Sequence, residues 1–294
     1  MERFGLEPGA HILEPSVGVG HFFGLMPERL YPGTRRTGVE LDSVSASIAA
    51  SLYPESTIHR SAFEDTPFPK DYFDAAVGNI PFGNYPIYDP AYGESPHLTH
   101  AIHDYFLAKC LDVIRPGGVI AVITSRYSMD KLDSSVRRHL AEGSTLLGAI
   151  RLPNTTFKSN AGTEVTTDIL FLQKRSPDTL PGEPWIDVQS IETADGPIAV
   201  NEYLVRHPEM MLGRMGLESG QYGRAPALIG TLQPGDLKMA VSLLPTSIYK
   251  GRNGRAPLLP SGPEQVPAAG AVKEAHLQIV MARSSCAAAV FSSL

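Results

Sequence analysis

The chain has 294 residues, of which 43% are hydrophobic and 19% are charged, which is ordinary globular usage. This composition excludes a wholly disordered, a collagen-like and a disulfide-scaffold protein, and the 27 glycines and 25 prolines indicate many turns. The formal net charge of −6 argues against a tight, self-sufficient nucleic-acid binder, although it is compatible with a local basic groove.

Short apolar strands alternate with helical patterns through the first half of the chain. The predicted strands cover residues 10–14, 36–41, 57–59, 73–78 and 119–125. The predicted helices cover residues 21–30, 43–53, 98–114 and 130–142. This alternation is typical of a parallel sheet that is covered by helices on both faces.

Two further strands follow, at residues 146–152 and 166–173, and no helical pattern separates them. Strands that lack a crossover helix pair antiparallel, or lie side by side across a long loop. The sequence therefore predicts an α/β fold with a doubly wound, mostly parallel seven-stranded sheet that ends in an antiparallel strand pair.

The texture of the sequence changes after Arg175, where a linker-like stretch begins. We expect one domain at residues 1–175 and a small accessory or linker region at 176–250, with one helix at 235–244. Residues 251–294 are rich in Ala, Ser, Gly and Pro and are predicted to form a disordered tail. The C-terminal extension as a whole is expected to be irregular.

The first strand runs into a glycine loop that precedes a helix. Gly18 and Gly20 let backbone N–H groups approach a ligand closely. Phe23 replaces the third glycine of a dinucleotide fingerprint, and no Gly-Lys-Ser/Thr follows, so neither a dinucleotide loop nor a P-loop is indicated. The loop predicts a tight turn against a ligand, with a plain strand–helix turn as the alternative.

An acidic residue ends the second strand. Glu40 lies 20 residues beyond Gly20, where an acid is placed to accept hydrogen bonds from ribose hydroxyls. An ordinary helix N-cap role for Asp42 or Ser43 is the alternative interpretation of this segment.

The fourth strand ends in Asn79-Ile80-Pro81-Phe82. Ligands of open parallel sheets bind beyond the carboxyl ends of the strands, so this turn should share a crevice with the glycine loop. The Asn79 carboxamide and a neighbouring carbonyl offer two acceptors, and Phe82 offers a flat face for stacking. Together they favour a planar, NH2-bearing ligand, whereas a strand-ending turn with a buried Phe is the alternative.

In this order and spacing, EPSVGVGHF, VELD and GNIPFGNY resemble the class I S-adenosylmethionine-dependent N6-adenine DNA methyltransferases. The chain is similar above all to the methylase domains of large helicase–methylase proteins of phages and mobile elements. RLPNTTFKSNAGTEVTTDILFLQKR is similar to the same subgroup. The resemblance covers about residues 5–175 and implies a Rossmann-like methyltransferase fold.

The resemblance also implies a role for each motif. The residues that would hold S-adenosylmethionine are Glu14, Pro15, Ser16, Gly18, Gly20, Glu40, Asp42, Phe63, Glu64 and Asn79. Glu40 would hold the ribose, and Phe63 with Glu64 or Asp65 would contact the cofactor adenine. The catalytic residues would be Asn79, Ile80, Pro81 and Phe82. The Asn79 side chain and the Ile80 carbonyl would accept from the target N6 amine, and Phe82 would stack on the extruded base.

This chemistry needs no strong base, because two acceptors that favour a tetrahedral nitrogen localise its lone pair for attack on a sulfonium methyl group. No metal is required, and the spacing of His97, His100 and His103 spreads the rings around a helix. The implied function is methyl transfer to the N6 amine of adenine, with DNA as the partner.

The sequence departs from the family pattern at three places. Ile80 is acceptable as the middle residue of the catalytic turn because only its carbonyl is used. Ala62 stands where many members have an Asp before the Phe. The helix and loop that precede the first strand in the family are nearly absent, and no target-recognition domain is evident. We therefore expect a fragment or a truncated product, with a helicase or target-recognition domain in a longer protein as partner.

Two alternatives stay open. A methyltransferase of an amide nitrogen in protein glutamine would use the same turn and suits the acidic net charge, and an amino nitrogen of RNA is a further option. A truncated, non-catalytic module could instead bind nucleic acid or a partner. Candidate phosphate contacts are Arg137, Arg138, Lys250, Arg252 and Arg255, although solvated surface is the expected role for each.

No run of about 18 apolar residues occurs, and the N-terminus lacks a basic region followed by an apolar core. The sequence thus predicts neither a membrane span nor a secretory signal. Cys110 and Cys286 do not form a disulfide framework, and Cys110 fits an apolar helical pattern as a buried thiol. A cytoplasmic location is the expectation.

Overall fold

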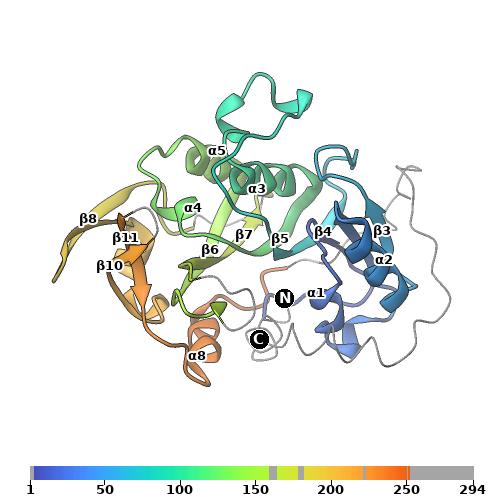
Figure 1. Cartoon of the computed structure of the whole chain (residues 1–294). Coiled ribbons are helices and arrows are strands. Elements are labelled where there is room, and N and C mark those ends of the chain that lie inside the picture. The colour runs from blue at the N-terminus through green and yellow to red at the C-terminus, as the bar shows by residue number, and fades with distance from the viewer. Residues whose placement is uncertain (1–2, 159–163, 178–181, 221–222, 250, 252–294) are drawn as a thin grey trace.

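The computed structural model describes residues 3–158, 164–177, 182–220, 223–249 and 251. A seven-stranded sheet with the order β3-β2-β1-β4-β5-β7-β6 runs through its centre (Figure 1). The strands are β1 His11–Glu14, β2 Arg35–Glu40, β3 Thr57–Arg60, β4 Phe73–Asn79, β5 Ile114–Ser125, β6 Ser144–Leu152 and β7 Thr167–Lys174. Strands β1 to β5 pair in parallel, and β7 pairs antiparallel with both β5 and β6. The predicted α/β class, the doubly wound and mostly parallel sheet and its antiparallel end are therefore confirmed.

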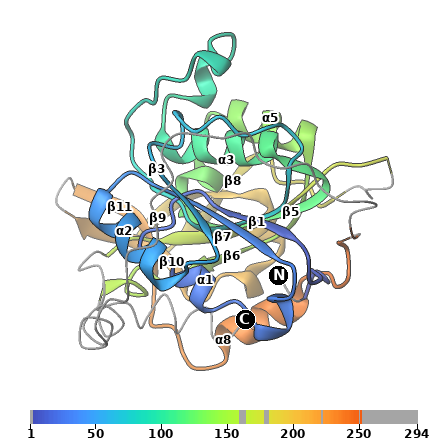
Figure 2. The same cartoon turned by 90° about the vertical axis from the view of Figure 1, so that its right-hand side faces the viewer.

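Helices cover both faces of this sheet. The α-helices of this part are α1 His21–Gly24, α2 Ser43–Leu52, α3 Ile102–Val113, α4 Tyr127–Asp130 and α5 Ser135–Gly143. Figure 2 shows α3 and α5 together on one side of the sheet and α1 on the other. The short 3-10 turns are η1 Glu28–Leu30, η2 Pro90–Tyr92 and η3 Pro96–Leu98.

Three predicted helices differ in extent from the observed ones. The helix predicted over residues 21–30 breaks after Gly24, because Pro27 is extended (φ −58°, ψ 136°) and has no N–H to continue the helix. The helix predicted over 98–114 begins only at Ile102, after an extended Ala101. The helix predicted over 130–142 begins only at Ser135, as α5, because Lys131 is extended (φ −58°, ψ 131°) and ends the preceding helix α4.

The C-terminal part is more regular than its sequence suggests. It holds two antiparallel hairpins, which lie beside the β6 end of the sheet (Figure 1). Their strands are β8 Val188–Thr193, β9 Gly196–Asn201, β10 Arg214–Gly220 and β11 Gly223–Ile229. The helical elements are α7 Glu202–Arg206, η4 Pro208–Met210 and α8 Asp236–Leu243. The sequence predicted only the last of these, as residues 235–244, and that helix is confirmed.

A single core cluster joins the sheet to this C-terminal part. Trp185, Val200 and Leu228 are buried in the same cluster as Ile120 of β5 and Ile150 of β6. The boundary between residues 175 and 176 therefore crosses a continuous core, and the division into domains stays a prediction. The predicted tail at 251–294 lies outside the described residues, except for Gly251.

Two single-residue expectations have clear outcomes. Cys110 is a buried thiol, as predicted, with 1% exposure. Arg137 was expected on the solvated surface and is instead buried, with its guanidinium donating to the carbonyls of Ile186 (2.7 Å) and Lys131 (2.6 Å). Arg138 does lie at the surface. Within the described ranges, no helix is long and apolar enough to cross a membrane.

Candidate functional site

The carboxyl ends of β1, β2 and β4 lie next to one another. Leu13 is the register partner of Ala76 in β4, and Glu14 is the partner of Gly38 in β2. A Cβ placed on Gly78 would lie 3.5 Å from Glu14 Cγ, so the two strand ends are in side-chain contact. The structure therefore brings the glycine loop, Glu40 and the Asn79 turn to one edge of the sheet, as the sequence predicted.

The glycine loop is fastened to β2 through its backbone. Gly18 N–H donates to Glu40 Oε2 at 2.8 Å, and Val17 N–H donates to the Val39 carbonyl at 2.9 Å. Gly18 (φ +53°) and Gly20 (φ +88°) both lie in the left-handed region that favours glycine. Their surroundings differ, since a Cβ on Gly20 would meet the Tyr53 ring at 2.3 Å and a Cβ on Gly18 would meet no atom within 4 Å. Gly20 is thus required by packing, whereas Gly18 borders open space.

The carboxylates of Glu40 and Asp42 both accept hydrogen bonds from backbone N–H groups. Glu40 Oε1 accepts from the Asp42 N–H at 2.8 Å, so both carboxylate oxygens of Glu40 have a backbone partner. A carboxylate has about four acceptor positions, which leaves room for ribose hydroxyls. Asp42 accepts from the Ser45 N–H at 2.7 Å and is the N-cap of α2, as the alternative interpretation expected. That bond lowers the pKa of the exposed Asp42.

Glu14 is the unusual group of this edge. Its side chain is 1% exposed, and burial followed by the charge of Glu40 raises its pKa well above the ordinary value, against a hydrogen bond from the Phe22 backbone. Its Oε2 has no hydrogen-bond partner among the described residues. A buried carboxylate oxygen without a donor is costly, protonation relieves that cost in the free protein, and a donor group of a ligand would also satisfy it. Pro15 beside it is buried, and Ser16 is half-buried.

Phe63 does not offer its ring to a ligand. The ring is 2% exposed and packs on Phe106 with centroids 4.9 Å apart. Lys109 Nζ donates to the carbonyls of Phe63 and Glu64, which fixes the loop after β3. The predicted contact of Phe63 with a cofactor adenine could therefore involve only the Phe63 backbone, and it stays a prediction. Glu64 is half-buried, and Asp65 is exposed.

The Asn79–Phe82 turn caps the carboxyl end of β4. Asn79 is exposed at the strand end, where Ile123 of β5 is its register partner. The Ile80 N–H donates to the Ile123 carbonyl at 3.1 Å, and the Ile80 side chain is 1% exposed. Pro81 and Phe82 are half-buried. The turn is thus anchored by Ile80 while the Asn79 side chain stays accessible.

Phe82 borders a cavity of about 750 Å³. Its walls come from five segments: the turn after Phe82, the start of α3, the end of β5 with α4, the β6–β7 loop, and the β10–β11 hairpin. Arg126, Asn154 and Glu218 are among the lining residues that the sequence did not indicate. The basic and aromatic pair at the end of β5 was a signal for Arg126, and Asn154 lies in the stretch that resembles the methylase subgroup, whereas the hairpin with Glu218 carries no motif.

The β10–β11 hairpin is pinned to the β6–β7 loop. The Asn154 N–H donates to the Leu228 carbonyl at 2.9 Å, and the Leu228 N–H donates to Thr166 Oγ1 at 2.8 Å. The Asn154 side-chain amide also donates to the Glu218 carboxylate. The hairpin is therefore a fixed wall of the cavity.

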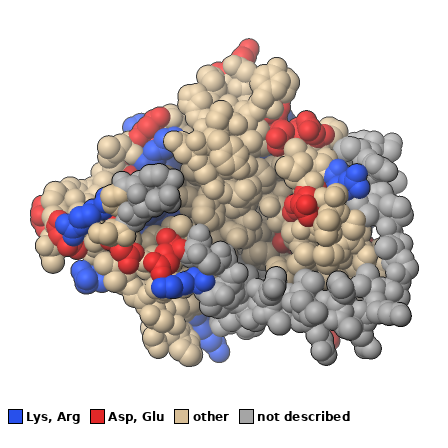
Figure 3. Space-filling model, viewed as in Figure 1, with Lys and Arg blue, Asp and Glu red and all other residues tan. Residues whose placement is uncertain are grey.

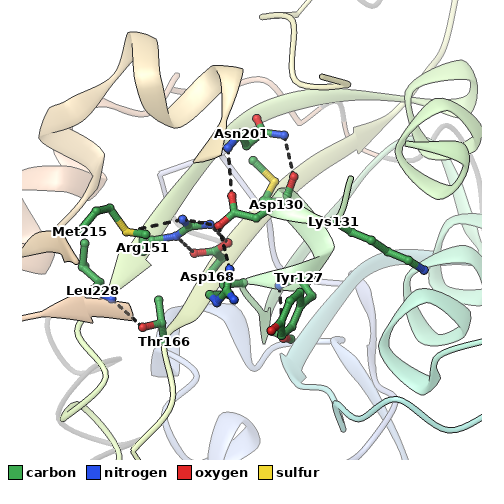
Figure 4. A network of polar contacts seen from close by, with 12 residues as sticks. Tyr127, Asp130, Lys131, Arg151, Thr166, Asp168, Asn201, Met215 and Leu228 are labelled. Atoms are coloured by element: carbon green, nitrogen blue, oxygen red, sulfur yellow. Dashed lines mark hydrogen bonds and ion pairs between the residues drawn. The ribbon is translucent and has the colours of Figure 1, made fainter. Parts of the chain in front are cut away.

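A buried ionic network lies behind the same wall (Figure 4). Arg151 is fully buried and binds Asp168 through two hydrogen bonds of 2.8 Å and Asp130 through one of 2.7 Å. Asp130 also accepts from the Asn201 N–H at 2.9 Å. Burial lowers the pKa of Arg151, but the two carboxylates outweigh it and raise the pKa above the usual range. The network ties α4 to β6, β7 and β9.

Comparison with known proteins agrees with this arrangement. No family model matches the sequence. "Defense against restriction protein B" of Escherichia phage P1 is 34% identical over 205 residues, which are 66% of this chain and 8% of that protein. The chain thus spans less than a tenth of the length of this curated relative.

Two solved structures share the fold. One is a putative class I S-adenosylmethionine-dependent methyltransferase from Listeria monocytogenes, with a TM-score of 0.52, 20% identity, and 63% of this chain and 59% of that chain covered. The other is a modification subunit of a putative type I restriction enzyme from Vibrio vulnificus, with a TM-score of 0.50, 15% identity, and 80% and 57% covered. The chain has the class I methyltransferase fold.

Proposed function

We propose that this chain transfers a methyl group from S-adenosylmethionine to the N6 amine of adenine in DNA. One observation carries the proposal: the Asn79–Phe82 turn lies between the Gly18 and Glu40 edge on one side and the 750 Å³ cavity on the other. A cofactor edge and an acceptor cavity that share one amine-binding turn are what this reaction requires.

The cofactor edge fits S-adenosylmethionine. The unpartnered Glu14 carboxylate oxygen suits the ammonium group of its methionine part, Gly18 borders free space, and Glu40 keeps acceptor capacity for ribose hydroxyls. When bound, the cofactor supplies a methyl group on a sulfonium, which is a good leaving group. The other residues proposed to line the cofactor-binding edge are Pro15, Ser16, Gly20, Asp42, Phe63 and Glu64.

The turn activates the acceptor without a strong base. The Asn79 side-chain oxygen and the Ile80 carbonyl accept hydrogen bonds from the two N–H groups of the target amine. These bonds localise the nitrogen lone pair for in-line attack on the methyl group. Phe82 holds the base by stacking. The nitrogen gains one methyl group and loses one proton, and water takes the proton because Asn79 is exposed.

The test combines cofactor binding with product identification. Calorimetric titration with S-adenosylmethionine should show micromolar binding that Glu40→Ala weakens and Asn79→Ala largely spares. Incubation with random-sequence DNA and labelled cofactor should then give N6-methyladenine by nucleoside mass spectrometry, with a loss of about 10²–10³-fold in rate for Asn79→Ala. Cofactor binding by wild type with no methylated nucleoside would refute the DNA acceptor.

A protein amide is the second candidate acceptor, because the acidic net charge of −6 does not favour a polyanion, and an RNA amino group is a further option. The same assay on RNA and on glutamine-containing protein substrates distinguishes it from DNA methylation. A well-folded chain that binds no S-adenosylmethionine would instead be a non-catalytic module. Because the chain matches 8% of its phage relative, we propose that a helicase or target-recognition region supplies sequence specificity.

A further inference from the structure

Arg126 is a buried cation whose bonding is incomplete. It lies between the end of β5 and α4, it lines the cavity, and its exposed fraction is 7%. Within the described residues its guanidinium makes one side-chain hydrogen bond, from Nη1 to Asp130 Oδ2, at a long 3.4 Å. A guanidinium carries five N–H donors, so most of them have no hydrogen-bond partner among the described residues.

Asp130 is committed elsewhere. Its Oδ2 accepts from Arg151 at 2.7 Å and its Oδ1 from the Asn201 N–H at 2.9 Å, both shorter than the bond from Arg126. Figure 4 shows Asp130 directed toward Arg151 and Asn201. Arg126 therefore competes for a carboxylate that is already bound, and an anion in the cavity would be a better partner.

The other charged groups of the cavity have polar partners in the described residues, and for Lys131 and Glu164 that partner carries the opposite charge. Lys131 Nζ lies 3.3 Å from Asp104 Oδ2, and Glu164 forms an ion pair with Lys158. Glu218 accepts from Asn154.

His103, in the same wall, has a pKa that burial lowers, so it is neutral at neutral pH. Of the two cations that line the cavity, Arg126 is the more deeply buried, and its carboxylate partner is already bound by Arg151.

Tyr127 completes this anion site. Its ring is half exposed and its centroid lies 4.2 Å from the Arg126 guanidinium carbon, so the ring holds the guanidinium plane in place. A fixed guanidinium fork matches the two free oxygens of a phosphodiester. The cavity of about 750 Å³ is far larger than a side-chain amide needs.

We propose that Arg126, stacked on Tyr127, binds the phosphodiester beside the target base and so makes the acceptor a nucleic acid rather than a protein amide. This inference rests on the proposed function, because it names the acceptor of the same site. In the view of Figure 3, few charged side chains lie in the middle of the molecule.

The experiment measures binding of a fluorescein-labelled, random-sequence single strand and its duplex by anisotropy, between about 50 and 200 mM salt. Arg126→Gln should weaken binding about tenfold or more and reduce the slope of log affinity against log salt by about one. Arg126→Lys should restore the slope, because it keeps the charge, but only part of the affinity. S-adenosylmethionine affinity should be unchanged in both variants.

Arg138→Gln is the matched control, because it removes the same charge from an exposed site, and it should alter neither affinity nor slope. Equal slopes for wild type and Arg126→Gln, or no strand binding by wild type, would overturn the inference while leaving methyl transfer possible. If Arg126→Gln changes the affinity and the slope as expected but the wild type transfers no methyl group, the proposed function is refuted and the anion site is retained. If Arg126→Gln does not fold, the affinity of Arg126→Lys decides, and an affinity equal to that of wild type would overturn the inference.

Discussion

The two ends of the site are built in different ways. At the cofactor end, the contacts that matter join residues close to the strand ends of β1 and β2, and the Gly18–Glu40 bond is the key link. At the acceptor end, one cavity collects walls from segments between Phe82 and Ala227. The cofactor end is held by hydrogen bonds to the backbone at adjacent strand ends, whereas the acceptor end forms only when elements distant in sequence pack together.

This difference predicts where each end is vulnerable. Backbone bonds to a glycine loop tolerate changes of neighbouring side chains and fail when the glycine itself changes. A buried ionic network fails when one partner is removed, because the remaining charges lose their compensation. The predictions below test that contrast.

The largest effect is expected for Arg151→Leu. The change leaves Asp130 and Asp168, both almost fully buried, without their common cation. We expect a loss of about 3–5 kcal/mol in the free energy of unfolding, measured by urea titration followed by circular dichroism. Folded Arg151→Leu should still bind S-adenosylmethionine, because the network lies at the acceptor end.

The control for this change is Arg138→Leu. Arg138 is 61% exposed and its contact with Asp187 is 3.8 Å long, so the stability should change by no more than about 0.5 kcal/mol. Loss of cofactor binding by a folded Arg151→Leu protein would show that the two ends are coupled and would break the comparison.

The next largest effect separates the two glycines of the cofactor end. Gly20→Ala should cost about 3 kcal/mol, because strain at φ +88° adds to a clash with Tyr53. Gly18→Ala should cost only about 1–2 kcal/mol, because its Cβ points into open space. The Gly18 variant should nevertheless lose most cofactor affinity in calorimetry, and unchanged affinity would place the cofactor elsewhere.

The contrast also explains what the sequence could predict. The strand order follows from apolar runs separated by helical patterns, and the edge formed by Glu14, Glu40 and Asn79 follows from strand adjacency. These signals are local, or depend on one topological rule. The break at Pro27 was missed because the apolar pattern continues through a residue that cannot extend a helix.

The acceptor walls could not be predicted in this way. The β8–β9 hairpin had one weak local signal, the pair Asp195-Gly196, but its two-residue loop is Ala194-Asp195 and Gly196 already belongs to β9. Nothing in the sequence places β10 and β11 against Asn154, because that contact joins segments more than 60 residues apart. Arg137 was assigned to the surface for the same reason, since its partners are carbonyls that only the fold brings near.

A smaller and opposite effect is expected for Glu14→Gln without cofactor. The folded-state pKa of Glu14 is raised above the ordinary value of 4.5, so the folded chain keeps a proton that the unfolded chain has lost. Stability therefore falls as pH rises from about 4.5 through the folded-state pKa, and Glu14→Gln removes that loss. The variant should have the higher melting temperature at neutral pH and should equal wild type below pH 4, while losing cofactor affinity.

The smallest effects distinguish the two acids after β2. Glu40→Gln should weaken S-adenosylmethionine binding about tenfold, because the carboxylate both holds the Gly18 N–H and would accept from the ribose. Asp42→Asn should change the affinity by no more than about threefold, because Asn also caps a helix and the α2 cap is the contact that Asp42 makes in this structure. Calorimetric titration of both variants with S-adenosylmethionine measures which of the two loses more affinity. An Asp42 effect as large as that of Glu40 would mean that the cap carboxylate itself contacts the cofactor, and the cofactor end would then depend on side chains as much as on backbone.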